Sequence, residues 1–205
     1  MGTRLATVLV ASMLGWAASA GADPVVVLPP GATWEYTFTD PTADPTWNIT
    51  TGVGGTWSSG AAPFGNCPAA GCLDVTRDFD FNTFWADDFD LDDDLWVRTE
   101  VSVDASLLNS LYWALGVDNG FKLYVNGVLI AADNAEGYTS RWEYSGGIPL
   151  AALQSESQVI ALALEDHGVL TAFDMQISTA PIPEPATLFL FGAGLAGGAL
   201  RRWRR

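Results

Sequence analysis

The densest group of potential metal ligands is an acidic run from Asp87 to Asp94, in which six of eight residues are aspartate. Carboxylate oxygens are the ligands that Ca2+ prefers in proteins. The run therefore predicts a structural calcium site, with Asp88, Asp90 and Asp92 as the candidate ligands. It lacks the EF-hand pattern, because the glycine at the sixth position and the glutamate at the twelfth are missing. A solvated loop without metal is the alternative.

Few residues suggest catalysis. His167 is the only histidine, and Asp166 directly precedes it, which does not suit a carboxylate that orients the imidazole. The chain has no Gly-x-Ser-x-Gly motif of the kind that presents a nucleophilic serine. We therefore interpret His167 as a loop or surface residue and expect no catalytic residues and no enzyme activity. The many acids leave a glycan hydrolase with paired carboxylates open as an alternative.

Seven of the nine tryptophans lie between residues 23 and 180. Aromatic rings can stack on sugar rings, and the polar edge of tryptophan suits a wet surface. Trp47, Trp57 and Trp142 stand among Thr, Ser, Gly or charged residues. This setting predicts that the three rings are exposed and able to stack on a glycan. Packing in the core or on a sheet is the alternative.

The segment from residue 181 to 205 combines three features in order: Pro183-Glu184-Pro185, an uncharged run Ala186–Leu200, and the arginines Arg201, Arg202, Arg204 and Arg205. As a helix the run would be about 22 Å long at about 1.5 Å per residue, which makes a short membrane span. The arginines predict that this end faces the cytoplasm. A buried core helix is the alternative.

These features resemble the PEP-CTERM sorting signal of bacterial surface proteins. In that family a membrane protease-transpeptidase, exosortase, cuts near the Pro-Glu-Pro motif and passes the protein outward. The resemblance implies that Pro183, Glu184 and Pro185 form the processing motif. It also implies that helix 186–200 anchors the precursor transiently in the inner membrane, with 201–205 as a cytoplasmic tail. The resemblance concerns the export and sorting of the protein, and it leaves the role of the preceding residues open.

Residues 1–22 have the layout of a secretory signal peptide. Arg4 supplies the positive region, Leu5–Trp16 the apolar region, and Ala18-Ser19-Ala20 a cleavage site for signal peptidase. Ala20-Gly21-Ala22 is a second candidate cleavage site, and an N-terminal membrane anchor is the alternative. We expect a precursor anchored in the membrane and a mature form at the cell surface or outside the cell.

The exported part, residues 23–180, is long enough for one domain with a core. It carries 4 basic and 23 acidic residues, and thus a formal charge of −19. We expect no nucleic-acid partner, because phosphates must be neutralised by Lys and Arg.

Cys67 and Cys72 are the only cysteines and bracket Pro68-Ala69-Ala70-Gly71. Export brings them into an oxidising compartment, so the sequence predicts a disulfide across this short loop. A two-cysteine metal site is the alternative.

Strand patterns dominate the exported part, and no amphipathic helix stands out. The expected strand regions are Trp34–Thr39, Leu95–Val103, Leu111–Ala132, Gln158–Leu164 and Leu170–Ser178. Asn119-Gly120 and Asn126-Gly127 are expected to be hairpin turns. The second turn would set Val125 opposite Val128, Leu123 opposite Ile130 and Phe121 opposite Ala132, with all six on the core side. Many short strands between turns predict an all-β fold, an antiparallel β-sandwich.

Five segments resemble the galactose-binding-like jelly roll: Leu95–Arg98, Asp118–Gly127, Ile148–Leu150, Val159–Asp166 and Ala172–Asp174. That resemblance implies a jelly-roll ectodomain from a family whose members commonly bind sugars and often hold a structural calcium. Since fold alone does not define function, three hypotheses follow. The first is an exported, non-catalytic surface or matrix protein associated with exopolysaccharide. The others are a carbohydrate-binding module with a defined glycan ligand and a secreted glycan hydrolase.

Overall fold

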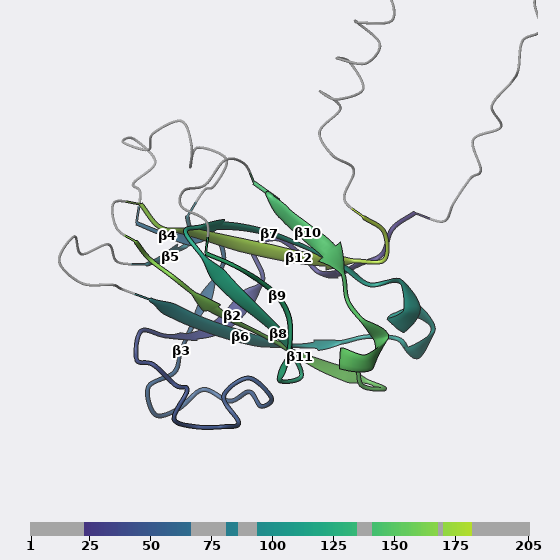
Figure 1. Cartoon of the computed structure of the whole chain (residues 1–205), viewed down its shortest axis with the longest axis horizontal. Helices are drawn as coiled ribbons and strands as arrows, with labels where there is room; N and C mark the ends of the chain where they lie inside the picture. Colours follow the sequence, from purple (N-terminus) through teal and green to yellow (C-terminus); the bar gives the residue numbers. More distant parts are fainter. Residues whose placement is uncertain (1–22, 67–80, 86–93, 135–140, 168–169, 182–205) are drawn as a thin grey trace, which may run out of the picture.

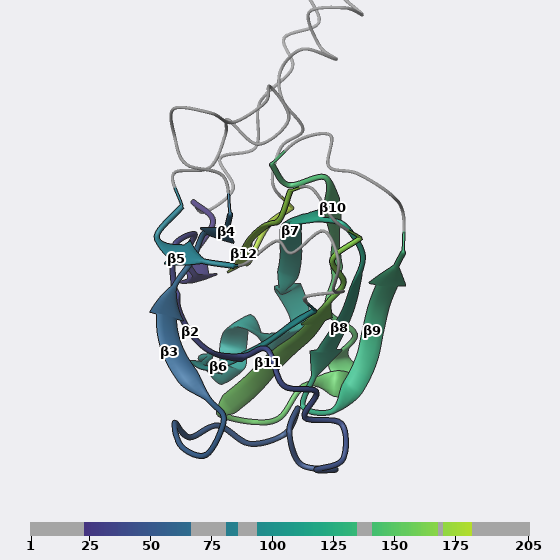
Figure 2. The ribbon, with the colours of Figure 1, turned by 90° about the vertical axis from the view of Figure 1, so that its left-hand side faces the viewer.

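Two six-stranded β-sheets face each other in the computed structural model (Figure 1), which describes residues 23–66, 81–85, 94–134, 141–167 and 170–181. Sheet A has the order β10-β7-β12-β4-β5, with β1 also paired to β12, and sheet B has the order β3-β2-β6-β11-β8-β9. The strands are β1 Val26–Leu28, β2 Thr33–Thr37, β3 Ser58–Ala61, β4 Phe64–Gly65, β5 Thr83–Phe84, β6 Leu95–Ser102, β7 Tyr112–Asp118, β8 Phe121–Val125, β9 Val128–Asp133, β10 Tyr144–Gly147, β11 Ser157–Leu164 and β12 Ala172–Ser178. Figure 2 shows the sheets as two layers.

The predicted all-β sandwich is confirmed for the described residues. Their only helical pieces are two 3-10 turns, η1 Ala105–Ser110 and η2 Leu150–Ala152. No helix in this part of the chain has the length and apolar character of a membrane span. The expected signal peptide and the expected span at 186–200 lie outside the described residues.

The core lies between the sheets, where side chains that alternate along the strands meet. Strand β11 lies between β6 and β8, and its residues are buried on both faces, as the apolar sequence predicts for a central strand. On β12 the predicted inward residues Phe173, Met175 and Ile177 all belong to the core. Trp34 of β2 is fully buried, and its ring packs edge-on against Phe173 at 5.3 Å.

The hairpin at Asn126-Gly127 is confirmed, but its register is only partly as expected. Asn126 and Gly127 have positive φ values of 49° and 79°, and Val125 pairs with Val128. Beyond this pair, Leu123 lies opposite Ala131 and Phe121 opposite Asp133, one residue away from the expected partners Ile130 and Ala132. An irregularity at Ile130, which has no partner in β8, inserts one extra residue into β9. Three expected core residues of β9 are therefore less buried: Val128 and Ala132 are exposed, and Ile130 is half-buried.

The predicted hairpin at Asn119-Gly120 is wrong. These two residues join β7 of sheet A to β8 of sheet B, and neither has a positive φ. Their backbone instead bonds to Glu165, with Asn119 N donating to Glu165 O and Glu165 N donating to Gly120 O. A Cβ on Gly120 would lie 3.0 Å from Asp133 O, so the glycine permits close approach of the backbones.

Candidate functional site

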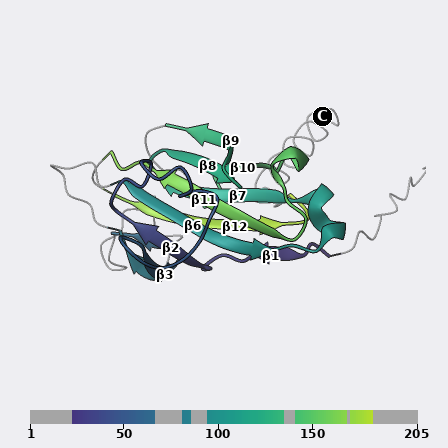
Figure 3. The same ribbon diagram turned by 90° about the horizontal axis from the view of Figure 1, so that it is seen from below.

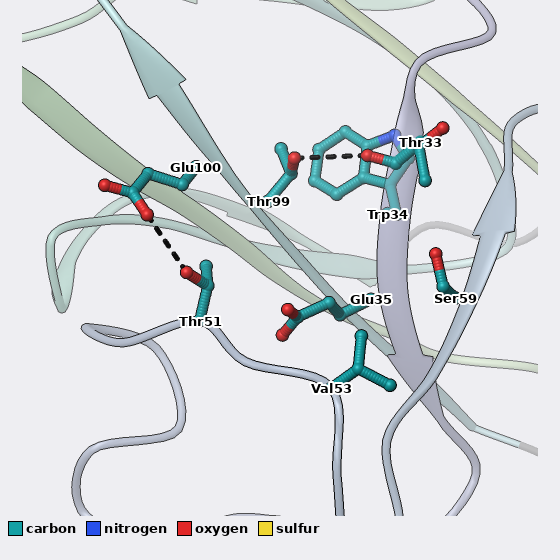
Figure 4. Close-up of a pocket in the computed structure, with 8 residues that line it drawn as sticks. All are labelled: Thr33, Trp34, Glu35, Thr51, Val53, Ser59, Thr99 and Glu100. Carbon is teal, nitrogen blue, oxygen red and sulfur yellow. Dashed lines mark hydrogen bonds between the residues drawn. The ribbon is translucent and has the colours of Figure 1, made fainter.

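A polar groove of about 230 Å³ lies on sheet B, over β2, β3 and β6 (Figure 4). A loop that follows β2 closes one side of it at Thr51 and Val53. The lining residues are Thr33, Trp34, Glu35, Thr51, Val53, Ser59, Thr99 and Glu100. Most of them carry hydroxyl or carboxylate groups, so the groove is built for hydrogen bonding.

Strand alternation places the carboxylates of this groove on one face. Glu35 of β2 pairs with Arg98 of β6, and Glu100 lies two residues further along β6. Side chains two residues apart in a strand share a face, so all three point away from the core. Trp34, next to Glu35, points the opposite way into the core.

Arg98 connects the groove to the loop between β2 and β3. Its Nε donates to Glu35 Oε2 at 2.8 Å, and its two terminal nitrogens donate to Trp47 O at 3.2 Å and Gly52 O at 3.1 Å. The guanidinium also stacks on the ring of Trp57, 3.8 Å from the ring centroid. The side chain is 6% exposed, so this charge is buried and satisfied from several directions.

Both groove carboxylates accept hydrogen bonds from the same loop. Glu35 accepts from Gly52 N at 2.7 and 2.8 Å, and Glu100 accepts from the Thr51 hydroxyl at 3.1 Å. The hydroxyls of Ser157, first, and Thr51 lower the pKa of Glu100 below its usual value of 4.5.

The three tryptophans proposed to stack on sugar do not form one platform. Trp57 is half-buried and does not line the groove; its ring stacks on Arg98, whose Nε donates to the groove residue Glu35. The prediction that Trp47 is exposed is wrong: its side chain is 6% exposed, because it packs edge-on against Tyr124 at 5.5 Å on the face that the loop covers. Trp142 is half-buried in a turn two residues before β10 of sheet A, and the guanidinium of Arg141 lies 4.9 Å from its ring centroid.

A second groove, of about 270 Å³, lies where β8, β9 and the end of β11 meet, and both polar and apolar residues line it. Lys122 Nζ donates to Glu165 Oε1 at 2.8 Å, which raises the pKa of Lys122. His167 lies nearby, with its Nε2 3.6 Å from Glu165 Oε2, and is an exposed loop residue as expected. Among the described residues, no cluster of three or more His, Cys, Asp or Glu side chains could hold a metal ion.

Several predicted site residues lie outside the described part of the chain: the cysteines Cys67 and Cys72, the calcium candidates Asp88, Asp90 and Asp92, the motif Pro183, Glu184 and Pro185, and the arginines Arg201, Arg202, Arg204 and Arg205. The disulfide and the calcium site stay predictions. Sequence reasoning missed Glu35 and Arg98. The signal was present, since Arg98 is one of 4 basic residues in the exported part and lies mid-strand.

An ion pair between the buried Asp174 and the half-buried Arg141 lies on the outer side of sheet A. Asp174 of β12 is fully buried and accepts from Arg141 Nη2 at 2.6 Å, Gly31 N at 3.1 Å and Met175 N at 2.9 Å. Burial raises the pKa of Asp174 above its usual value of 3.8, and the Gly31 amide and Arg141 only partly oppose this. The Asp174 carboxyl therefore binds its proton more tightly in the folded protein than in the unfolded chain.

This raised pKa predicts the sign of a pH effect in the variant Asp174→Asn. The stabilisation that comes from protonated Asp174 is fully present below the pKa of this carboxyl in the unfolded chain, near 3.8. It is lost as the pH rises through the higher pKa that the carboxyl has in the folded protein. The free energy of unfolding of the natural protein, relative to the variant, should therefore be lower at pH 7 than at pH 4. Urea unfolding of both proteins at the two pH values measures this difference. A relative stability that grows with pH would contradict the burial argument.

Comparison with known proteins identifies the tail. Residues 181–205 match the PEP-CTERM protein-sorting motif. This match supports a protein that is exported, processed by exosortase and sorted to the cell surface. No curated protein matched the chain.

The chain also matches solved structures of β-glucuronidase from Ruminococcus gnavus. For the complex with D-glucuronic acid the identity is 15% and the TM-score 0.47, with 77% of this chain and 30% of that chain covered. For the enzyme described without a ligand the identity is 13% and the TM-score 0.47, with 77% and 29% covered. This chain thus spans less than a third of the length of the proteins it matches.

Proposed function

We propose that this protein is an exported, non-catalytic surface or matrix protein that exosortase processes at its C-terminal motif and that associates with exopolysaccharide. The sorting motif at residues 181–205 is the observation that carries the proposal. Signal peptidase removes the N-terminal segment during export, and the inner membrane holds the precursor transiently. The sandwich that it carries is a galactose-binding-like jelly roll.

The groove on sheet B supports contact with glycans. Its hydroxyl and carboxylate groups match the hydrogen-bonding groups of sugars, and Trp57 offers an aromatic ring that stacks on Arg98, the partner of the groove residue Glu35. This observation also favours the second candidate function, a carbohydrate-binding module with one defined glycan ligand. Retention by many extracellular polysaccharides would favour a matrix protein, whereas retention by one would favour a module.

A pull-down of the purified exported protein on extracellular polysaccharide from its host tests this role. Trp57→Ala should weaken retention by roughly fivefold, since an aromatic contact contributes about 1 kcal/mol. Trp142→Ala is the matched control, because Trp142 lies in a turn before β10 of sheet A and should leave retention unchanged. Unfolding curves of both variants establish that each is folded. No retention of the natural protein, or equal retention of the Trp57 variant, would contradict the proposal.

A further inference from the structure

The folded domain continues without a linker to the residue before the sorting motif. Beyond the last residue of β12, Thr179 N donates to Val25 O at 3.0 Å, and Val25 N donates to Thr179 Oγ1 at 2.9 Å. Ser178 Oγ donates to Ala180 O at 2.7 Å. The matched motif begins at residue 181. The chain is therefore fixed to the sandwich as far as Ala180.

The sequence between the sandwich and the uncharged run is short and rich in proline. Five residues, Pro181 to Pro185, separate Ala180 from Ala186, and three of them are proline. Fully extended chain spans at most about 3.6 Å per residue, so Ala180 and Ala186 are at most roughly 22 Å apart. Proline-rich sequence is also semi-rigid. A tether of this length keeps one end of the sandwich close to any membrane that holds residues 186–200.

The end of the sandwich at this junction is well defined, and we call it the terminal end. It contains β1, the end of β12 and both 3-10 turns, η1 and η2 (Figures 1 and 3). Val25, Val26 and Leu150 are exposed there, at 48%, 49% and 60%. Among the residues that the structure describes, the acids at this end are Asp23, Asp104 and Glu156. The basic residues of the described part, Arg98, Lys122 and Arg141, lie elsewhere in the sandwich. Contact with a bilayer would thus depend on the tether and on apolar side chains, without help from basic residues.

From this junction we infer that the sandwich of the membrane-anchored precursor stands directly on the outer surface of the bilayer, with the terminal end against the lipid. The opposite end, where β6 begins at Leu95 after the acidic run and where Glu165 and His167 lie, then faces away from the membrane. This inference rests on the proposed anchoring of the precursor by residues 186–200. It adds an orientation that a flexibly linked domain would not have.

Energy transfer to a dye on lipid headgroups tests this orientation in the full-length precursor, reconstituted into phosphatidylethanolamine–phosphatidylglycerol vesicles. An azide-bearing amino acid replaces either Ala105 or Ala132, and a fluorophore is attached to it. Both alanines are exposed, the first in η1 at the terminal end and the second in β9 near the opposite end. A strand of eight residues separates the two ends by roughly 25 Å, so transfer from position 105 should exceed transfer from position 132 by about twofold or more.

Insertion of twelve Gly-Ser residues between Ala180 and Pro181 is the matched control. Such a linker has a root-mean-square length of roughly 20 Å, so the difference between positions 105 and 132 should largely disappear. Equal transfer from both positions in the natural precursor, with the protein floating with the vesicles, would overturn the orientation and leave anchoring intact. A precursor that does not float with the vesicles would overturn both the anchoring and the orientation that depends on it.

Discussion

Replacing Arg98 by alanine should lower the free energy of unfolding by about 3–5 kcal/mol, the usual cost of breaking a buried ion pair by removing one partner. The change removes the pair with Glu35 and the bonds to the Trp47 and Gly52 carbonyls. It also leaves the ring of Trp57 without its stacked guanidinium. The midpoint of thermal unfolding should fall by on the order of 10 °C for a domain of this size.

The conservative variant Arg98→Lys should recover little of this stability. A lysine ammonium cannot reproduce the planar fork or the stacking of a guanidinium. Lys122→Ala is the matched control, because Lys122 makes an ion pair with Glu165 but is 50% exposed. Removal of such a surface pair should cost at most about 1 kcal/mol. If the Arg98 and Lys122 variants unfold at the same temperature, Arg98 does not hold the loop to sheet B.

The same contacts explain which parts of the fold the sequence could predict. Alternation along β6 and β12, and the continuous apolar sequence of β11, reflect contacts within the sandwich. The expected strand regions Leu95–Val103, Gln158–Leu164 and Leu170–Ser178 correspond to these three strands. Alternation cannot reveal that the loop between β2 and β3 folds over the outer face of sheet B. The burial of Trp47 and the role of Arg98 both depend on that loop, and both were missed.

The turns show a similar limit to prediction from local sequence. Asn126-Gly127 and Asn119-Gly120 have the same residue types, yet only the first is a hairpin with positive φ. The second pair is held by the backbone of Glu165, which is distant in sequence. The extra residue at Ile130 in β9 likewise has no local signal, because it depends on pairing with β8. At these positions, contacts between residues distant in sequence determine the backbone conformation, and the local sequence does not predict it.

The sorting motif, in contrast, can be recognised from the local sequence, because its residues are adjacent in the chain. Pro183, Glu184 and Pro185 form one short segment before the uncharged run, and Glu184 is the only charge in it. The variant Glu184→Ala leaves the apolar run and the four arginines intact. The precursor should therefore still insert, while the membrane protease no longer recognises the motif. Most of the variant should accumulate uncleaved in the membrane fraction.

An immunoblot of membrane and released fractions from the native host, comparing the natural protein with Glu184→Ala, measures this processing. Glu156→Ala is the matched control, since Glu156 is an exposed acid of the sandwich outside the motif. We expect the natural protein and the Glu156 variant to be cut and released alike, while the Glu184 variant stays at precursor size in the membrane. Release of the Glu184 variant as fast as the natural protein would contradict the role of Pro183-Glu184-Pro185 as the sorting and processing motif.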